Sequence, residues 1–516
     1  MLFKLLPIYL IIEDMIKLVK NLLNKLTMYQ AMLYFLRGTI ALAVILSFFG
    51  ILPYVWWHIL LQLAILIAVC VGANYIFSKI FKIKPNYESQ YITAEILTLI
   101  VGPTDPIANW QFLVLLGIIS MGSKYILAWN RRHVFNPAAF AVVFSAVVLG
   151  QGASWWVGNQ YLVLFVLLGG LLVVYKLKWF HLTNAFLIVY LLGSAVIAIS
   201  NGANLAFTYD LLETLVLNSA LLFFTFVMLI EPLTAPPGRR YKTLYGALAA
   251  ILILILQNYM NIYYGFELGL IAANLGAFLV SRNPRFSLTL VNKNQIAANT
   301  YLFEFEPLKR FAFKPGQYLE WTLNHSGADT RGSRRFFSIA SSPTETNVML
   351  LTKFANPGSS FKKALADMKP GEEILASHLD GDFILPNDDS KLVLIAGGTG
   401  IAPFRSMIKN MIDTGSKKDI IFFYTSRTEA DFALKDLFAQ AEEFGVKAHY
   451  IATDKEGFIT PELIKKEVSD FMDRKFYVSG PEPMVEAYEK MLYAMGIPKN
   501  KVTRDYFEGY TETYTK

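Results

Sequence analysis

Two glycine-containing turns near the C-terminal end of the 516-residue chain have the residue types that bind phosphate groups. The first turn lies between the apolar run 392–396 and a predicted helix over 401–411. Glycine lets a backbone come close to phosphate, and free N–H groups at a helix start attract anions. A second turn, Gly480-Pro481, follows another apolar run. This order of strand, turn and helix predicts a dinucleotide site with contacts from Gly397, Gly398, Thr399, Gly400, Gly480 and Pro481.

The elements that must position these turns lie in a part of the chain that has the pattern of a soluble protein. Runs of alternating polarity predict strands at 287–291, 301–305, 317–323, 337–340, 348–354 and 373–377. Pro-Gly turns after Lys314 and Lys369 separate them, which is typical of a small antiparallel barrel. From Lys391, strands alternate with helical segments, as in a parallel sheet covered by helices. We therefore expect a β-barrel domain over 286–388 and an α/β nucleotide-binding domain over 389–516.

A basic and aromatic motif, Arg334-Arg-Phe-Phe-Ser-Ile-Ala-Ser-Ser-Pro343, lies within the predicted barrel. A guanidinium offers a fork of donors to phosphate, and an aromatic face can cover a flat ring. With this motif the soluble half resembles the ferredoxin–NADP reductase family, whose barrel motif is Arg-x-(Tyr/Phe)-Ser. The resemblance implies that Arg335 neutralises the pyrophosphate of FAD, Phe337 stacks on the isoalloxazine and Ser338 hydrogen-bonds near N5. Phe336 belongs to the same cofactor-binding motif.

A second segment, Asn356-Pro-Gly-Ser-Ser-Phe361, is similar to the other FAD segment of that family. At a helix start, serines offer hydroxyl and N–H groups to an anion. The resemblance implies that Gly358, Ser359 and Ser360 contact the pyrophosphate. Each piece taken singly is also compatible with an ordinary turn, whereas their order and spacing favour the cofactor interpretation.

The same resemblance places the turn at Gly480 beside the nicotinamide. Most relatives have cysteine where this chain has Ser479, so a serine hydroxyl would line the hydride path. Ser338 and Ser479 are therefore the candidate catalytic residues. Arg427, after the predicted strand 420–424, is a candidate ligand of a 2′-phosphate or a solvated loop arginine, so NADH and NADPH both stay open.

The C-terminal tail, Asp505-Tyr-Phe-Glu-Gly-Tyr510, also resembles that family. The resemblance implies that Phe507 or Tyr506 packs against the flavin and is displaced when the nicotinamide arrives. The alternative is an apolar plug for the last strand.

The first half of the chain is nearly all apolar. Apolar runs predict an all-α polytopic domain over 31–282, and a span of about 20 apolar residues crosses a bilayer. Residues 1–30 mix apolar groups with lysines and predict an interfacial amphipathic segment. Two runs, 91–103 and 136–151, are short enough to be half-helices or tilted segments. The ten predicted spans are 31–52, 57–78, 91–103, 107–127, 136–151, 161–175, 182–200, 212–233, 244–260 and 265–281.

The charges of the loops predict the orientation of these spans. Alternate loops carry Lys79, Lys82 and Lys84; Arg131 and Arg132; Lys176 and Lys178; Arg239, Arg240 and Lys242; and Arg282 and Arg285. The intervening loops have no lysine or arginine. Positive charge stays cytoplasmic. The pattern predicts a multi-pass protein of the cell inner membrane, with both termini and the soluble domains in the cytoplasm.

Two stretches interrupt the apolar pattern, Arg131–Phe140 with its Asn136-Pro137 pair, and Met228–Arg240. With them, residues 30–282 resemble the membrane subunit shared by the sodium-pumping NADH:quinone reductase and the Rnf complex (the NqrB/RnfD family). Broken helices at such motifs expose N–H groups to an anionic or flavin-like group. Helix caps and turns at the cytoplasmic rim are the alternative.

The sequence departs from the NqrB/RnfD family at the stretch to which that family attaches a second cofactor. That family attaches FMN to a threonine in a Ser-Gly-Ala-Thr-like stretch, and the counterpart here, Gln151-Gly-Ala-Ser154, has no threonine. Thr234 is a substitute, although its position favours a structural role. A non-covalent second flavin (FMN or riboflavin) or a quinone in the membrane domain stays open.

Composition excludes some functions and argues against others. One cysteine, Cys70, cannot hold an iron–sulfur cluster, which needs about four ligands, and no metal site is predicted. The net charge of +7 comes largely from short loops between spans, so we expect no nucleic-acid partner. A haem-dependent transmembrane metal or oxygen reductase needs paired axial histidines. The membrane half has only His58, His133 and His181, all close to predicted span ends.

The sequence as a whole predicts an NAD(P)H-dependent flavin oxidoreductase in the lipid bilayer. Electrons from NAD(P)H would pass through FAD to a flavin or quinone in the membrane domain, with ion coupling and partner redox subunits open. A transporter whose soluble half supplies electrons is the alternative from another class, and a haem-dependent transmembrane metal or oxygen reductase is the weaker third alternative.

Overall fold

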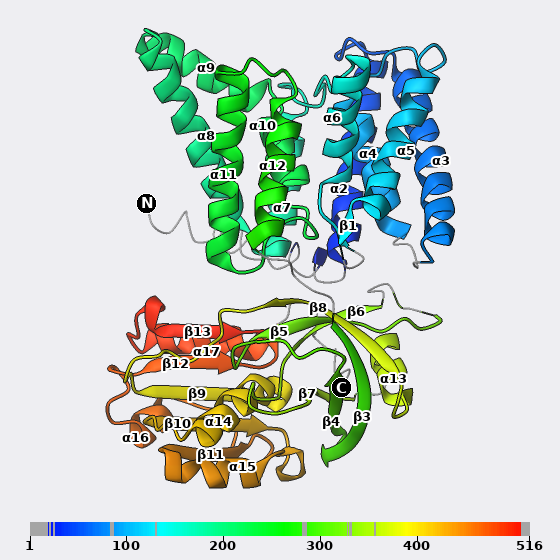
Figure 1. The fold of residues 1–516 in the computed structure, drawn as a ribbon. Helices are drawn as coiled ribbons and strands as arrows, with labels where there is room; N and C mark the ends of the chain where they lie inside the picture. The colour runs from blue at the N-terminus through cyan, green and yellow to red at the C-terminus, as the bar shows by residue number, and fades with distance from the viewer. Residues whose placement is uncertain are drawn as a thin grey trace. The chain divides into compact units, whose positions relative to one another are not determined.

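The computed structural model describes residues 19, 22–23, 26–82, 87–129, 132–280, 286–327, 329, 333–354 and 358–506. The chain divides into two compact units, Met1–Asn283 and Pro284–Lys516. The first unit is helical, and the second contains two β-sheets with flanking helices (Figure 1).

The N-terminal unit is a bundle of apolar helices with one small hairpin, β1 (Ala128–Trp129) and β2 (Arg132–His133). Many large apolar side chains are exposed on these helices, such as Ile188 and Leu192 on α8. A helix that is apolar all round fits a lipid environment. The helical segments are α2 (Met28–Phe48), α3 (Trp56–Ile80), α4 (Tyr87–Ile100), α5 (Trp110–Ile126), α6 (Pro137–Leu149), α7 (Val163–Leu177), α8 (Phe180–Ser200), α9 (Leu205–Leu217), α10 (Leu221–Phe223), the π-helix η2 (Phe224–Met228), α11 (Arg239–Asn258) and α12 (Gly265–Val280).

Four of these helices, α2, α3, α8 and α11, are long and apolar enough to cross a membrane. The pair formed by α9 and α10–η2 passes the same test but bends by 54°. Shorter apolar helices are α5, α6, α7 and α12, and α4 has 14 residues. Every predicted span overlaps a helix or this bent pair, whereas a membrane crossing by all ten stays a prediction.

The predicted span at 212–233 is wrong in its boundaries. Helix α9 begins at Leu205, because the side chain of Asn204 accepts a hydrogen bond from the N–H of Phe207 and caps the helix. The helical backbone then breaks after Leu217 and ends in the π-helix at Met228. Apolarity alone does not reveal such a cap or break.

Contacts between loops place several positively charged segments together. The ammonium of Lys242 lies 4.8 Å from the ring centre of Trp179, which joins the start of α11 to the connection between α7 and α8. Arg132 donates to the carbonyl oxygen of Ala235 at 3.2 Å, which joins the β-hairpin to the turn before α11. These segments therefore lie at one end of the bundle.

Loops without lysine or arginine contact one another in the same way. The rings of Tyr54 and Trp156 lie 5.1 Å apart, which joins the α2–α3 loop to the α6–α7 loop. The hydroxyl of Tyr263 donates to the carbonyl oxygen of Ala146 at 3.4 Å, which joins the α11–α12 loop to the end of α6. The loops with lysine or arginine thus contact one another, and the loops without these residues contact one another. The charge pattern of the sequence predicts the same two groups of loops.

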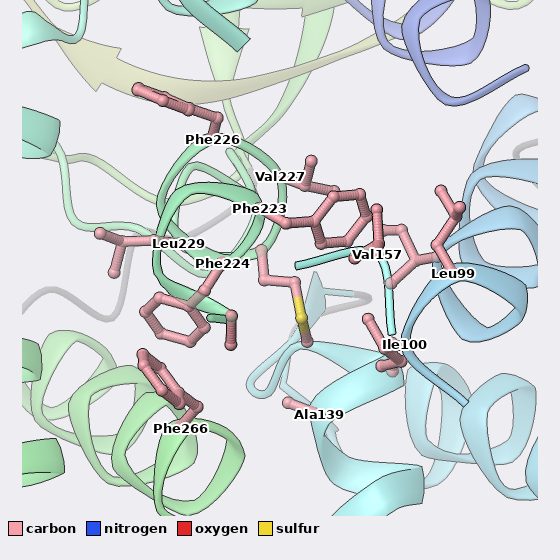
Figure 2. Packing of buried hydrophobic residues seen from close by; sticks show 14 of the residues in the cluster. Leu99, Ile100, Ala139, Val157, Phe223, Phe224, Phe226, Val227, Leu229 and Phe266 are labelled. Atoms are coloured by element: carbon pink, nitrogen blue, oxygen red, sulfur yellow. The ribbon is translucent and has the colours of Figure 1, made fainter. Parts of the chain in front are cut away.

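The interior of the N-terminal unit packs around the π-helix η2. Figure 2 shows Phe223, Phe224 and Phe266 among aliphatic side chains from other segments of the unit. The rings of Phe224 and Phe266 lie 5.1 Å apart, and the ring of Trp155 lies 5.8 Å from Phe266. A π-helix frequently marks a functional position in a helix.

The first sheet of the C-terminal unit has six antiparallel strands in the order β6-β5-β8-β3-β4-β7. Its edge strands are joined only by the isolated bridge Ile339↔Leu350. The predicted antiparallel sheet is confirmed, whereas a fully closed barrel is not formed by the described strands. The helix α13 (Ser360–Asp367) follows β7. The strands are β3 (Phe286–Ala297), β4 (Thr300–Pro307), β5 (Tyr318–Thr322), β6 (Arg334–Ser338), β7 (Val348–Lys353) and β8 (Glu373–Asp380).

The second sheet has five parallel strands in the order β11-β10-β9-β12-β13. From β9 the chain adds strands on one side and then crosses to the other side at β12. Ligands of such sheets bind at this switch point, beyond the carboxyl ends of the strands. The elements are β9 (Leu392–Gly397), β10 (Ile420–Ser426), β11 (Val446–Ala452), β12 (Lys475–Ser479), β13 (Val502–Asp505), α14 (Ile401–Thr414), α15 (Lys435–Gln440), α16 (Pro461–Glu467) and α17 (Glu482–Ala494).

Candidate active site

The two predicted phosphate-binding turns meet at the switch point of the parallel sheet. Ala396 of β9 is in register with Ser479 of β12, so Gly397 and Gly480 lie side by side at the strand ends. A Cβ atom on Gly400 would lie 2.3 Å from the carbonyl oxygen of Ser479. No side chain fits at that distance, so close packing of the two turns requires glycine there.

The first turn also exposes backbone to a ligand. Gly398 has a φ of +52°, which L residues rarely adopt, and it begins a single 3-10 turn that leads directly into α14. Thr399 and Pro481 are exposed, whereas the strand residues behind them are buried. The structure therefore places the predicted nucleotide-binding residues together at the start of a helix.

The two candidate catalytic serines converge on one carboxylate. Ser338 ends β6 of the antiparallel sheet, and Ser479 ends β12 of the parallel sheet. Their Oγ atoms each donate to Oδ2 of Asp505, both at 3.3 Å. Both serines are buried. Residues separated by more than a hundred positions thus form one site between the two sheets.

Asp505 is a site residue that the sequence analysis did not single out. It ends β13, and the parallel register of β12 and β13 places it opposite Ser479. One feature of the sequence could have indicated Asp505: it is a carboxylate at the end of the last predicted strand, next to the aromatic tail. Its position depends on sheet order, which the sequence does not specify.

Tyr318 lines the same region and is opposite Ser338 in the β5–β6 pairing. Desolvation raises the pKa of this phenol well above its ordinary value, and the nearby carboxylates of Asp380 and Asp505 raise it further. Tyr318 therefore stays a neutral phenol, able to donate or accept a hydrogen bond beside the serines.

Arg335 lies in an anion-binding cradle at the start of α13. Its Nη2 atom donates to both carboxylate oxygens of Asp329, at 2.9 and 3.1 Å. The N–H of Ser360 donates to Oδ2 of the same carboxylate at 3.2 Å. Ser359 caps the helix, because its hydroxyl accepts from the N–H of Lys362 at 3.3 Å.

The chemistry of these donors fits the pyrophosphate of FAD. A buried guanidinium and a helix-start N–H already hold one oxyanion here, and both bind phosphate oxygens in the same way. Phe361 follows Ser360, and its ring lies 5.4 Å from the guanidinium carbon and 5.9 Å from the ring of Phe337. An aromatic face therefore accompanies the anion site, as a flavin dinucleotide requires.

Other predicted residues lie at different positions. Phe336 points to the face of β6 opposite Phe337, where its ring meets Tyr318 edge-on at 5.6 Å. Gly358 directly precedes the Ser359 cap. Arg427 is exposed after β10, and Phe507 lies outside the described residues.

A buried ion pair holds the two sheets of the C-terminal unit in place. Arg405 of α14 donates to the two carboxylate oxygens of Glu345, at 2.8 and 2.9 Å, and to the carbonyl oxygen of Ala340 at 2.8 Å. Next to it, Ser406 donates to the carbonyl oxygen of Ser341 at 2.6 Å. These contacts join the helix behind the glycine turn to the segment that follows Ser338.

The N-terminal unit brings its two motifs together at a separate pocket. His133 and Glu231 form a 2.8 Å pair, and Arg132 donates to the carbonyl oxygens of Leu233 and Ala235. Thr234 is buried with its hydroxyl directed at Glu231. The pocket is lined by Trp129, Arg132, His133, Val134, Leu233, Thr234, Ala235, Ala277 and Phe278.

Asn136 acts as an ordinary helix cap. Its side-chain oxygen accepts from the N–H of Ala139 at 3.0 Å, and its amide donates to the carbonyl oxygen of Met228 at 3.3 Å. The backbone N–H of Asn136 donates to the side chain of Asn274. The helix-cap interpretation of this motif therefore accounts for its contacts.

Comparison with known proteins identifies the class of the C-terminal unit. Residues 394–490 match the family model of the oxidoreductase NAD-binding domain. The reductase component of propane 2-monooxygenase from Mycolicibacterium goodii is 30% identical over 217 residues, covering 38% of this chain and 60% of that protein. One of the subunits of the Na(+)-translocating NADH-quinone reductase from Yersinia pestis is 29% identical over 204 residues, covering 35% of this chain and 50% of that protein.

Among solved structures, the Amycolatopsis cytochrome P450 reductase GcoB has a TM-score of 0.39 and 24% identity, covering 44% of this chain and 71% of that one. The chain spans 60% and 50% of the length of the two curated relatives above. The family match and the two curated relatives show that the C-terminal unit contains a reductase-type NAD-binding domain, and they confirm the predicted enzyme class, an NAD(P)H-dependent flavin oxidoreductase, for this unit.

Proposed function

We propose that this chain is a membrane-bound enzyme that oxidises NADH or NADPH through FAD and passes the electrons to a flavin or quinone in its N-terminal unit. One observation carries the proposal. Ser338, predicted to lie beside the flavin, and Ser479, predicted to lie beside the nicotinamide, bind the same carboxylate. A site of this composition suits hydride transfer between two flat rings held face to face.

The residues of the chain have defined tasks in this reaction. Arg335 and the N–H of Ser360 bind the pyrophosphate, and the turn at Gly397–Gly400 binds the phosphates of the dinucleotide. Ser338 and Ser479 fix the positions of the two rings, and burial of both serines excludes water from the path of the hydride. The bound flavin supplies the hydride-accepting chemistry, so no protein acid or base is required for that step.

The location of the enzyme in the inner membrane rests on the helices of the N-terminal unit. Four helices are long enough to cross a bilayer, and a bent pair can form a fifth crossing. Loops with positive charge contact one another, as do loops without it. This separation supports a multi-pass arrangement with the charged loops, both termini and the C-terminal unit in the cytoplasm.

The second redox group, a flavin or a quinone, is proposed to bind in the N-terminal unit without an assigned pocket. The cavity beside Thr234 has room for about one water. Its polar groups are already engaged, because Arg132 donates to the carbonyl oxygens of Leu233 and Ala235 and His133 pairs with Glu231. The hydroxyl of Thr234 is directed at Glu231, so we propose a group that is not covalently attached. We also propose that the N-terminal unit is similar to the NqrB/RnfD membrane subunits and that the chain works with partner redox subunits.

A redox-linked transporter is the second candidate. The observation that favours it is the break between α9 and α10, followed by a π-helix, since broken helices in membranes commonly surround transported ions. The relative named as Na(+)-translocating supports the same idea. In this case electron flow and ion movement would be coupled in one chain.

The test uses the purified full chain in detergent and then in proteoliposomes. We expect a flavin spectrum that NADH or NADPH bleaches, recovery of the colour on addition of quinone, and all flavin in the supernatant after acid precipitation. Arg335→Ala should lose FAD, whereas Lys475→Ala, which removes a surface ion pair with Asp388, should retain it. Flavin-free protein with intact helices would overturn the proposal, and NADH-driven ion uptake would favour the transporter.

A further inference from the structure

We infer that Asp329 is an internal competitor of the FAD pyrophosphate and sets the affinity of this chain for FAD. The inference rests on the proposed function, because it assumes that Arg335 and Ser360 bind that group. Asp329 lies in the connection between β5 and β6, and its carboxylate takes the same donors.

The contacts of Asp329 are those of a bound anion. Nη2 of Arg335 donates to both of its oxygens, and the N–H of Ser360 donates to one of them. The N–H of Asp329 in turn donates to the hydroxyl of Ser360 at 2.9 Å. A carboxylate held by one guanidinium nitrogen, Nη2, and a helix-start N–H occupies the place that one phosphate group would take in such a cradle.

Asp329 takes the Nη2 group of Arg335 and the N–H of Ser360, so these two donors are not available to a second anion at the same time. Arg335 is only 4% exposed, so its guanidinium has little access to water and needs an anion beside it. The backbone N–H of Ser360 carries a single hydrogen. A pyrophosphate that reached both donors would also lie against the carboxylate, and like charges in a poorly hydrated place repel strongly. Binding of the pyrophosphate therefore requires Asp329 to leave.

The position of Asp329 allows this exchange. Its side chain is 28% exposed, so it can turn towards water when it is displaced. The base of the connection is held independently, because the N–H of Leu323 donates to the carbonyl oxygen of Ser333 at 3.0 Å. Strands β5 and β6 can therefore stay paired while the aspartate moves.

Two effects follow from this competition. While Asp329 holds Arg335, it stabilises the flavin-free protein by giving a buried cation its partner. The same contact must be broken on FAD binding, so it weakens the observed affinity. Asp329→Asn should bind FAD about tenfold more tightly, the effect of roughly one charge-assisted contact, and should lower the melting temperature of the flavin-free protein.

The experiment measures FAD binding, by quenching of flavin fluorescence, to the full chain in detergent after removal of flavin. Asp329→Asn and Asp329→Ser are compared with Asp419→Asn, a matched control. Asp419 also pairs with a buried arginine, because Nη1 and Nη2 of Arg474 donate to its two oxygens at 2.7 and 3.0 Å, at a different place in the unit. Both Asp329 variants should tighten binding, and the control should leave it unchanged. The two Asp329 variants differ in side-chain size, so the competition can still be tested with one of them if the other does not fold.

The variant Arg335→Ala distinguishes a failure of the proposed function from a failure of the competition by Asp329. If it leaves FAD binding unchanged, the cradle is not the pyrophosphate site and the proposed function fails at this point. If Arg335→Ala weakens binding while both Asp329 variants bind FAD as the wild type does, or more weakly, the cradle stands and the competition is refuted.

Discussion

Ser338 and Ser479, which end strands in two different sheets, donate hydrogen bonds of the same length, 3.3 Å, to the same oxygen of Asp505. A single carboxylate thus fixes the distance between the flavin side and the nicotinamide side of the proposed site. Hydride transfer requires the reacting atoms to be about 3–3.5 Å apart, so a small change in this separation has a large effect on rate.

The first prediction concerns this shared carboxylate. Asp505→Asn should retain FAD but reduce the rate of flavin reduction by NADH about tenfold to a hundredfold, because the rings lose their fixed spacing. Stopped-flow measurement of flavin bleaching provides the rate. Asp382→Asn is the control, since Asp382 contributes to the same negative field at Tyr318 without binding the serines. Equal losses in both variants would show that charge, and not positioning, matters.

Much of this site could be predicted from the sequence because its parts are short and local. The motif around Arg335 and the turn at Gly400 each combine a strand with specific residue types, and the structure places the first on β6 and the second directly after β9. Ser338 and Ser479 were predicted for the same reason, and their roles stay predictions. Each is fixed by its immediate neighbours in the chain.

Asp329 and Asp505 were not predicted because their roles depend on pairings across the fold. Asp505 reaches Ser338 only through the order of strands β9, β12 and β13. Asp329 reaches Ser360 across the connection between two strands. No periodic pattern marks a carboxylate whose partner is distant in sequence. The break between α9 and α10 was missed for a related reason, since hydropathy is averaged over a whole span.

The second prediction concerns the close contact of the two glycine turns. Gly400→Ala would place a Cβ atom 2.3 Å from the carbonyl oxygen of Ser479, a backbone atom that cannot move cheaply. We expect the KM for NADH to rise about tenfold or more while FAD content is unchanged, because the turns must separate. Gly398→Ala is the control for backbone strain alone, since a Cβ there meets nothing within 4 Å. A normal KM in Gly400→Ala would contradict the assigned packing.

The third prediction concerns the ion pair between the sheets. Glu345→Gln leaves the buried Arg405 without its charged partner, which should destabilise the C-terminal unit by about 3 kcal/mol. Loss of protection of α14 in hydrogen exchange would locate the effect. Replacing the pair by Arg405→Met with Glu345→Leu should recover much of the stability, because an apolar pair carries no desolvation penalty. A double variant as unstable as Glu345→Gln would argue that the hydrogen bonds to Ala340 matter more.

The fourth prediction is a pH dependence of stability that arises from His449. Desolvation lowers the pKa of this imidazole from its ordinary value of 6.5, and Lys447 lowers it further, while Glu467 opposes the shift. The ring stacks on Phe423 with centres 5.2 Å apart. The unfolded chain therefore binds this proton more readily than the folded one. The contribution of His449 is complete above pH 6.5 and is lost as the pH falls through its lowered folded pKa.

His449→Phe should remove this contribution to the pH dependence while retaining the stack on Phe423. Melting temperatures of the full chain between pH 7.5 and pH 5, roughly one unit or more on each side of the ordinary histidine value, should fall less steeply in the variant. His325→Phe serves as the control, because His325 also lies beside a phenylalanine, Phe361, with ring centres 6.5 Å apart. If the two variants flatten the curve equally, the effect belongs to histidine content, and the desolvation of the half-buried His449 would not be its cause.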